Sequence, residues 1–398
     1  MVNVHSKALD EVIEVDRIIG HVAGKQKGAT LIFVGGIHGN EPAGVFALKK
    51  VLADLDPSVV RGDIYALAGN LSALEKGVRY HETDLNRLWT TEQLNDIRDG
   101  TEEILVQDQK EQLALHLLLK QIMNVNNGPF YFFDIHTTSS ETLPFLTIND
   151  SLLNRNFTAQ YPLPIILGIE EYLDGPLLSF VNELGYVAFG FEAGQHDTMT
   201  SIETSIAFIY LSLVFTGCIT AAVIDFQRYR DTLAKSAGDE TYIYEIVSRY
   251  VIKKDDHFKM EPGFLNFQRV QKNQVLAYVN GKPHTAQSNA RVFMPLYQNQ
   301  GSDGYFTIQK VWKPFLRLSA MIRKYRLDRI LVWLPGVRWT DKHRSGILVN
   351  KRVARFFTKE VFHLFGYRSI KVQENHYRMY NRESRAQNAM YLTADWNV

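Results

Sequence analysis

Residues 31–42 read LIFVGGIHGNEP, an apolar run that passes through a glycine-rich turn into a helical pattern. The β-branched and aromatic residues at positions 30–34 are apolar on both faces, which predicts a short strand in a sheet covered on both sides. Pro42 suits the first turn of a following helix, where a missing N–H costs nothing. The sequence therefore predicts that a buried strand delivers His38 and Glu41 to a loop.

The spacing of His38 and Glu41 is compatible with a metal site. Imidazole and carboxylate groups are common zinc ligands, and a set of two histidines and one glutamate leaves a coordination position for water or substrate. A lone His-x-x-Glu also recurs by chance in surface turns, so the motif by itself leaves both interpretations open. The metal interpretation requires a third ligand at the end of another strand.

An aromatic strand at positions 129–135 runs into a polar loop and brings His136 to the transition. Asp134 projects to the same side as His136, because side chains alternate along a strand. Histidines bound to a metal usually donate their other ring N–H to a carboxylate or carbonyl, so Asp134 is a candidate partner for that ring. The alternative for His136 is an ordinary strand-end histidine in a hydrogen bond.

Two further segments extend this pattern. Residues 79–87 read RYHETDLNR, and residues 190–194 read GFEAG at the end of an apolar strand. In order along the chain, the four motifs GGIHGNE, RYHETDLNR, DIHT and GFEAG resemble the succinylglutamate desuccinylase/aspartoacylase family, a branch of the zinc carboxypeptidase-like hydrolases. Four ordered motifs are far more specific than any one of them.

The resemblance implies a role for each matching residue. The family's ligands for one zinc ion per subunit correspond to His38, Glu41 and His136. Glu192 corresponds to the general base and acid, which takes a proton from zinc-bound water and returns it to the leaving amine. Arg79 corresponds to the arginine that polarises the scissile carbonyl, and Asn86 and Arg87 to the pair that holds the substrate carboxylate. A planar guanidinium can grip a carboxylate with two hydrogen bonds, which lysine cannot do.

Each of these residues also has a simpler interpretation. Glu192, between two glycines, could cap a turn. Arg79 and Arg87 could pair with Glu82 and Asp84 on an exposed loop, where such pairs contribute only about 0–1 kcal/mol. The agreement of four segments on one reaction centre favours the catalytic interpretation.

Alternating strands and helices predict an α/β fold, a mixed sheet flanked by helices with its site at the strand ends. We expect a zinc-binding catalytic domain at 1–230, a β-rich domain at 240–312 that borders the cleft, and a basic C-terminal α+β extension at 313–398. The extension carries 18 Lys and Arg against 6 Asp and Glu, whereas the whole chain has a net charge of +1. This asymmetry indicates a basic part docked on an acidic one, or a dimer contact.

An uncharged stretch at 204–224 is long enough to span a bilayer. Its Ser, Thr, Gly and Cys residues, and a capping-box pattern of Thr200 and Glu203 at its start, predict instead a helix buried against the sheet. The single cysteine, Cys218, excludes an internal disulfide and fits a reducing, cytoplasmic setting. Residues 1–16 contain no signal-peptide core.

The sequence thus predicts a zinc-dependent amidohydrolase that removes the acyl group from an N-acyl amino acid or a similar small carboxylated amide. Aspartoacylases place an arginine ten residues before the catalytic glutamate, and Asn182 stands at that position here, which puts acidic substrates in doubt. Two other classes stay open: a metallocarboxypeptidase with the same catalytic set, and a non-enzymatic anion or nucleic-acid binder built on residues 313–398. No nucleic-acid motif is present, and a homo-oligomer is compatible with the sequence.

Overall fold

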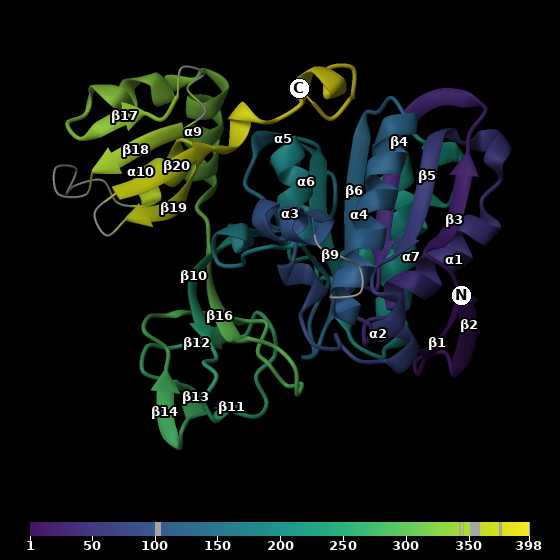
Figure 1. Cartoon of the computed structure of the whole chain (residues 1–398), viewed down its shortest axis with the longest axis horizontal. Helices are drawn as coiled ribbons and strands as arrows, with labels where there is room; N and C mark the ends of the chain where they lie inside the picture. Colours follow the sequence, from purple (N-terminus) through teal and green to yellow (C-terminus); the bar gives the residue numbers. More distant parts are fainter. Residues whose placement is uncertain (100–104, 342–343, 345, 351–358, 374–375, 398) are drawn as a thin grey trace.

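The computed structural model describes residues 1–99, 105–341, 344, 346–350, 359–373 and 376–397. Within these residues, an eleven-stranded sheet forms the centre of the molecule (Figure 1). Its strands, in spatial order, are β12 (Arg269–Val270), β15 (Ala290–Phe293), β16 (Asp303–Lys310), β10 (Ile243–Val251), β8 (Ile165–Leu167), β7 (Phe145–Ile148), β9 (Val187–Gln195), β6 (Phe130–Thr138), β4 (Gln26–Gly35), β5 (Arg61–Ala68) and β3 (Ile18–Ala23). Strands β5, β4, β6 and β9 run parallel, whereas β3 and β7 run antiparallel to their neighbours β5 and β9. The predicted mixed α/β sheet is confirmed.

Strand β4 is buried on both faces, as its apolar run predicts. Leu31 and Phe33 pack into one core cluster, and Ile32 and Val34 into another. The helices whose side chains join the first cluster are α1 (Ala43–Asp54), α5 (Leu152–Thr158), α7 (Met199–Phe215) and α8 (Phe226–Ser236). Those that join the second are α4 (Gln107–Val125) and α6 (Leu177–Leu184). The sheet is therefore covered on both sides.

Residues 204–215 of the uncharged stretch belong to helix α7, which is buried over most of its length, whereas the rest of the stretch leaves the helix at Thr216. The prediction that Thr200 and Glu203 cap the start of this helix was wrong, because the helix begins two residues earlier. The Thr198 hydroxyl accepts a hydrogen bond from the Ser201 N–H, while Thr200 already lies inside the helix. Among the described residues, no helix combines the length and the apolar character that a membrane span requires.

The sequence predicts one long loop from the end of β5 through Arg87, but this segment contains two short helices, α2 (Leu71–Lys76) and the 3₁₀ helix η2 (Leu85–Arg87). Helix α3 (Thr91–Asp99) follows it. The N-terminal residues form a separate hairpin of β1 (Val2–Ser6) and β2 (Glu11–Val15). The spacing of leucines predicts a helix from 102 to 125. Residues 102–104 lie outside the described residues, and α4 begins at Gln107. The other 3₁₀ helices among the described residues of this half are η1 (Pro57–Val59), η4 (Ile169–Glu171) and η5 (Ala221–Val223).

The main sheet continues across the expected domain boundary near residue 240. Strand β10 pairs in parallel with β8, so the β-rich region extends the main sheet. The strands β11 (Phe258–Met260), β13 (Val275–Val279) and β14 (Lys282–Thr285) form a separate three-stranded sheet. The three-domain division stays a prediction, and the sheet itself runs through both of the first two parts.

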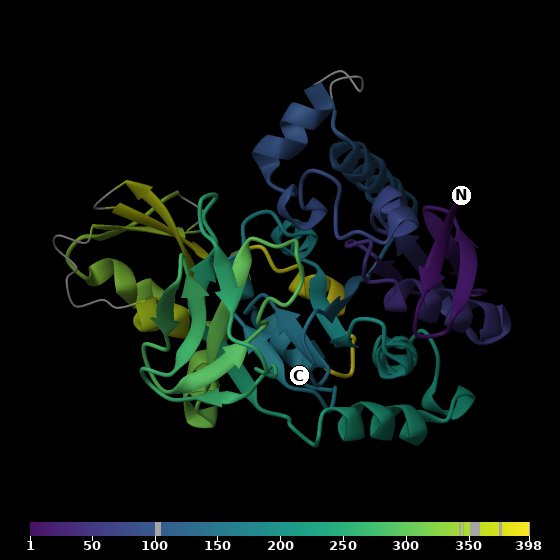
Figure 2. The same cartoon turned by 90° about the horizontal axis from the view of Figure 1, so that it is seen from below.

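The C-terminal extension forms a lobe beside this region (Figures 1 and 2). Its strands, in spatial order, are β17 (Val337–Trp339), β18 (Gly346–Asn350), β20 (His376–Asn381) and β19 (Tyr367–Gln373). Its helices are α9 (Lys313–Lys324), η6 (Leu327–Trp333), α10 (Lys359–Leu364), η7 (Arg382–Ser384) and η8 (Asn388–Tyr391). Beyond η7 the chain returns to the main sheet, where Tyr391 and Trp396 pack edge-on against Tyr131. The end of the chain is thus a packed element of the catalytic core.

Candidate functional site

The turn between β4 and α1 holds His38 and Glu41 in a buried position. Gly36 in this turn has a φ of +71°, a conformation that side chains rarely adopt. Gly39 passes so close to α2 that a Cβ there would lie 2.0 Å from the carbonyl carbon of Ala73. As a result, His38 is only 3% exposed and Glu41 only 2%.

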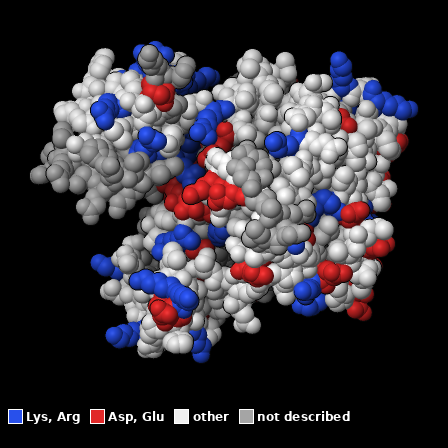
Figure 3. Space-filling model, viewed as in Figure 1, with Lys and Arg blue, Asp and Glu red and all other residues white. Residues whose placement is uncertain are grey.

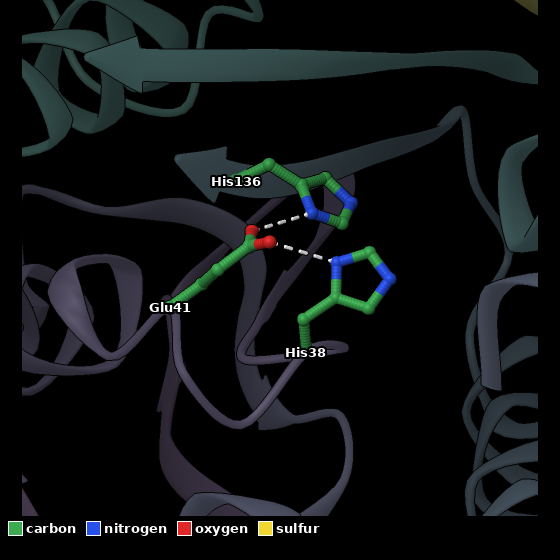
Figure 4. Close-up of side chains that lie close together, drawn as sticks. All are labelled: His38, Glu41 and His136. Carbon is green, nitrogen blue, oxygen red and sulfur yellow. Dashed lines mark hydrogen bonds and ion pairs between the residues drawn. The ribbon is translucent and has the colours of Figure 1, made fainter. Parts of the chain in front are cut away.

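Three of the predicted residues converge on one point (Figure 4). Because β4 and β6 are parallel, their C-terminal ends lie at the same edge of the sheet. The last residue of β4, Gly35, pairs with Ile135, and His136 is the next residue of β6. The Nδ1 atoms of His38 and His136 each lie 2.9 Å from a carboxylate oxygen of Glu41, and the three possible ligand atoms lie within 4.8 Å of one another. This donor set and its geometry fit a divalent cation with zinc-like preferences.

The outer nitrogens of both rings face aspartates. Nε2 of His136 lies 2.9 Å from Oδ2 of Asp134, as predicted, and Nε2 of His38 lies 3.1 Å from Oδ1 of Asp84. Burial raises the pKa of Asp84, but the charges of His38 and the neighbouring arginines more than offset this and hold it well below its usual range. Each histidine therefore turns Nδ1 toward Glu41 and Nε2 toward an ionisable carboxylate, which fixes the ring orientation.

The loop that contains residues 79–87 brings its arginines into the same site. The Arg79 guanidinium lies 3.3 Å from Glu41 and 3.4 Å from Asp84, so its pairing is not that of an exposed loop. Arg87 lies 3.3 Å from Asp303 of β16. The Asn86 side-chain oxygen accepts a hydrogen bond from the Leu177 N–H at 2.9 Å.

Glu192 lies within strand β9, directly opposite His136 in the parallel pairing of β9 with β6. The interpretation of this residue as a turn cap is therefore wrong. Its side chain is buried, and burial raises the pKa of Glu192 to about 8. Within the described part of the chain, its Oε2 has no hydrogen-bond partner. A carboxyl group that is buried and shifted in this way is typical of groups that exchange protons during a reaction.

A cavity of about 140 Å³ joins these groups. All of the predicted site residues line it, namely His38, Glu41, Arg79, Asn86, Arg87, His136 and Glu192. Residues of the β-rich region, including Leu296 and Asp303, line it as well. The cavity is thus lined both by residues at the strand ends and by residues of that region.

His196 is a cavity residue that the sequence analysis did not identify. Its Nδ1 lies 2.7 Å from the Thr137 hydroxyl and its Nε2 lies 3.4 Å from Oε1 of Gln298, while burial lowers its pKa. His196 lies two positions after the GFEAG motif, directly beyond the end of β9. This place at a strand end next to a motif is the sequence signal that could have identified it.

Asn182 also lines the cavity, but its amide is committed elsewhere. Its nitrogen donates to the backbone carbonyls of Leu178 and Ala188, and its oxygen accepts from Asn154. Asn182 therefore places a neutral side chain at the position where aspartoacylases carry an arginine. Its hydrogen bonds connect α6 with β9.

Residues 27–207 match the family model of the succinylglutamate desuccinylase/aspartoacylase catalytic domain. Over 171 residues the chain is 28% identical to the "Probable aspartoacylase" of Acaryochloris marina, an alignment that spans 41% of this chain and 54% of that protein. It is 31% identical to the aspartoacylase of Mus musculus over 118 residues, which span 29% of this chain and 36% of the mouse protein. The chain thus aligns with about half or less of these relatives' length.

Solved structures share the fold over a longer part of the chain. A succinylglutamate desuccinylase/aspartoacylase from Rhodobacter sphaeroides superposes with a TM-score of 0.56 at 16% identity, covering 76% of this chain and 91% of that one. The product-bound ectoine utilization protein from Ruegeria pomeroyi gives a TM-score of 0.53 at 18% identity, covering 73% and 87%. At these identities the likeness concerns the fold alone.

Proposed function

The chain belongs to the succinylglutamate desuccinylase/aspartoacylase family through its residues 27–207, and from that premise we propose that it is a zinc-dependent deacylase of N-acyl amino acids. The observation that supports this most is the convergence of His38, Glu41 and His136 on one point within a cavity that also contains Glu192 and Arg79. The substrate would be a small amide that carries a carboxylate.

Zinc held by the two histidines and Glu41 would supply a Lewis acid for the carbonyl oxygen and lower the pKa of a coordinated water. Glu192 accepts a proton from the attacking water and returns it to the leaving amine, because burial raises the pKa of its carboxyl group to about 8 and its Oε2 has no hydrogen-bond partner among the described residues. Arg79 stabilises the oxyanion that develops on the carbonyl. Arg87 and Asn86 orient the substrate through its carboxylate.

In the structure, Arg79 and Arg87 are engaged with Glu41, Asp84 and Asp303. A cation between the ligands would compete with Arg79 for Glu41 and leave its guanidinium free to face a carbonyl oxygen. The Nε atoms of both arginines have no hydrogen-bond partner among the described residues, so each retains a donor for the substrate.

The test is the Glu192→Gln variant, assayed on a panel of N-acyl amino acids and of peptides with a free carboxyl end. We expect kcat/KM to fall roughly 10²–10⁴-fold, the usual contribution of a general acid–base group, while zinc content stays unchanged. Glu203→Gln on the exposed face of α7 is the matched control and should retain activity. A chelator should abolish activity and added zinc restore it. Full activity of Glu192→Gln or of the metal-free protein would refute the mechanism, and cleavage of peptides alone would refute the deacylase assignment.

A further inference from the structure

One wall of the catalytic cavity contains a buried carboxylate that the proposed mechanism does not use. Glu170, in the 3₁₀ helix η4, lines the cavity, and its side chain is 3% exposed. Its Oε1 accepts hydrogen bonds from Nε and Nη2 of Arg382, at 3.2 and 3.0 Å. Its Oε2 has no hydrogen-bond partner within the part of the chain that the structure describes. A buried carboxylate oxygen without a donor is costly, so this oxygen indicates a position for a ligand group.

The electrostatic character of the cavity favours a cation at that position. Its lining includes five carboxylates, those of Glu41, Asp84, Glu170, Glu192 and Asp303, against the guanidinium groups of Arg79 and Arg87. From outside the lining, Arg382 pairs with Glu170 and Arg249 with Asp303. Both arginines are assigned to the amide and the α-carboxylate of the substrate. Asn182 is neutral and fully used by its own hydrogen bonds, so it offers no charge to an acidic side chain. Acidic side chains also gather on the surface in the recess between the C-terminal lobe and the main body (Figure 3).

The wall around Glu170 suits the methylene part of a basic side chain. Ile169, Leu173 and Leu178 line the same cavity and offer apolar contacts. A basic amino-acid side chain places an apolar stem below a charged head, and these residues could pack against the stem. A hydrogen bond between a cation and a carboxylate is among the strong ones in proteins, whereas a second carboxylate would be repelled.

The C-terminal lobe holds Glu170 in place. The buried Arg382 of η7 pairs with both Glu170 and Glu171, and Arg368 of β19 donates to the Glu170 backbone carbonyl. Arg382 is thus a positioning residue, which reaches the cavity only through Glu170.

We propose that Glu170 selects N-acyl amino acids with a cationic side chain, such as an amine on a short alkyl chain. This inference rests on the proposed deacylase function and names the substrate class within it. Glu170 binds the side-chain cation through Oε2, while Arg382 occupies Oε1.

The experiment compares kcat/KM of the full-length, zinc-loaded protein on four probes: N-acetylornithine, N-acetyllysine, N-acetylnorleucine and N-acetylglutamate. We expect one of the two cationic probes to be the best substrate and N-acetylglutamate to be the worst. Glu170→Gln should lower kcat/KM for the cationic probe roughly 10- to 100-fold, the usual difference between a charged and a neutral hydrogen bond, and leave N-acetylnorleucine within about threefold. Glu171→Gln is the matched control, because Glu171 pairs with Arg382 but is not among the residues that line the catalytic cavity.

The outcomes separate this inference from the proposed function. If the wild-type protein hydrolyses the probes but prefers N-acetylglutamate or N-acetylnorleucine, the side-chain assignment is overturned while the deacylase function stands. An equal loss on all probes in Glu170→Gln also overturns it, since it would show a structural role alone. If no probe is hydrolysed by the wild-type protein, both proposals fall. If Glu170→Gln does not fold, the order of kcat/KM values of the wild-type protein on the four probes still tests the side-chain assignment.

Discussion

At the scale of single residues, the candidate metal centre depends on carboxylates that are not themselves ligands. His38 and His136 each have one ring nitrogen on Glu41 and the other on an aspartate. The aspartates fix the ring orientation and make the inner nitrogens better ligands, so they should affect metal affinity even though they do not contact the metal.

We therefore expect Asp134→Asn to weaken zinc binding about 10- to 100-fold, since the amide can still face Nε2 of His136 but carries no charge. Zinc affinity is measured by competition with a chromogenic chelator. Asp63→Asn is a suitable control, because Asp63 pairs with His21 at 3.1 Å in a half-exposed position outside the site. Unchanged zinc affinity in Asp134→Asn would show that Asp134 plays no part in holding the ligand ring.

The two aspartates also show how far sequence reasoning reaches at this scale. Asp134 could be predicted because it lies two positions before His136 on one strand, where alternation determines which side chains share a face. Asp84 was considered only as a local partner of the arginines. Its contact with His38 spans 46 residues, and no local periodicity encodes that distance.

At the scale of elements, Asp108 of helix α4 holds the polar loop beyond α2 in place through hydrogen bonds. The Asp108 carboxylate is fully buried and accepts hydrogen bonds from the backbone N–H groups of His81, Glu82 and Thr83, at 2.8–3.2 Å. It also accepts from the side chain of Asn70 at 2.9 Å. One carboxylate thus anchors the segment that brings Arg79 and Asp84 to the metal site.

Asp108→Ala should release this segment. We expect a stability loss of about 1–3 kcal/mol from the unpaired groups, and a fall of roughly 10²-fold in kcat/KM, because a displacement of about 1 Å is enough for such an effect. Zinc affinity should fall by at most about 10- to 100-fold, through the displaced Asp84, since the three ligands themselves lie on other elements. Thermal unfolding, kinetics and zinc titration are compared with Glu82→Ala, whose exposed side chain comes from the loop itself. Retention of wild-type kcat/KM in Asp108→Ala would contradict the anchoring role.

The motif strands were predicted more accurately than the elements between them. Apolar runs that end in glycine-rich or polar stretches identified β4, β6 and β9, because a strand buried on both faces has a composition that a single sequence reveals. The helices α2 and η2 were missed, since short helices depend on caps. Asn70 caps α2 with its side chain and Asp84 caps η2 in the same way.

At the scale of the whole molecule, the basic extension docks onto the catalytic part through buried ion pairs. Arg323 of α9, with a side chain 1% exposed, lies 2.8 Å from the Asp150 carboxylate and 3.5 Å from Glu383. Arg382 pairs with Glu170 and Glu171 in the same interface. The charge asymmetry of the sequence indicated such docking, but not its partners, because the pair of Arg323 with Asp150 spans 173 positions and that of Arg382 with Glu170 spans 212.

Asp150 makes this interface sensitive to acid. Burial raises its pKa, but Arg155 and Arg323 more than offset this, so the pKa of Asp150 is well below its usual value of about 3.9. A carboxyl group with a depressed pKa contributes stability that is complete above the unfolded value. That contribution is lost as the pH falls, because the unfolded chain then binds the proton first. The Asp150 contribution should therefore be constant near neutrality and shrink progressively below about pH 5.

Asp150→Asn should lower the free energy of unfolding by about 3–5 kcal/mol at pH 7, because it leaves Arg323 buried with one remaining carboxylate at a longer distance. The difference from wild type should shrink between about pH 5 and pH 3, because the unfolded wild-type chain then takes up a proton on Asp150 that the folded protein does not bind. Urea unfolding at a series of pH values measures both effects. Asp54→Asn is the control, since its pair with Lys50 is exposed and should contribute less than about 0.5 kcal/mol at any pH. A difference that stays constant from pH 7 to pH 3 would mean that Asp150 acts through packing, and the basic extension would then be held by its apolar contacts, such as those of Tyr391 and Trp396 with the core.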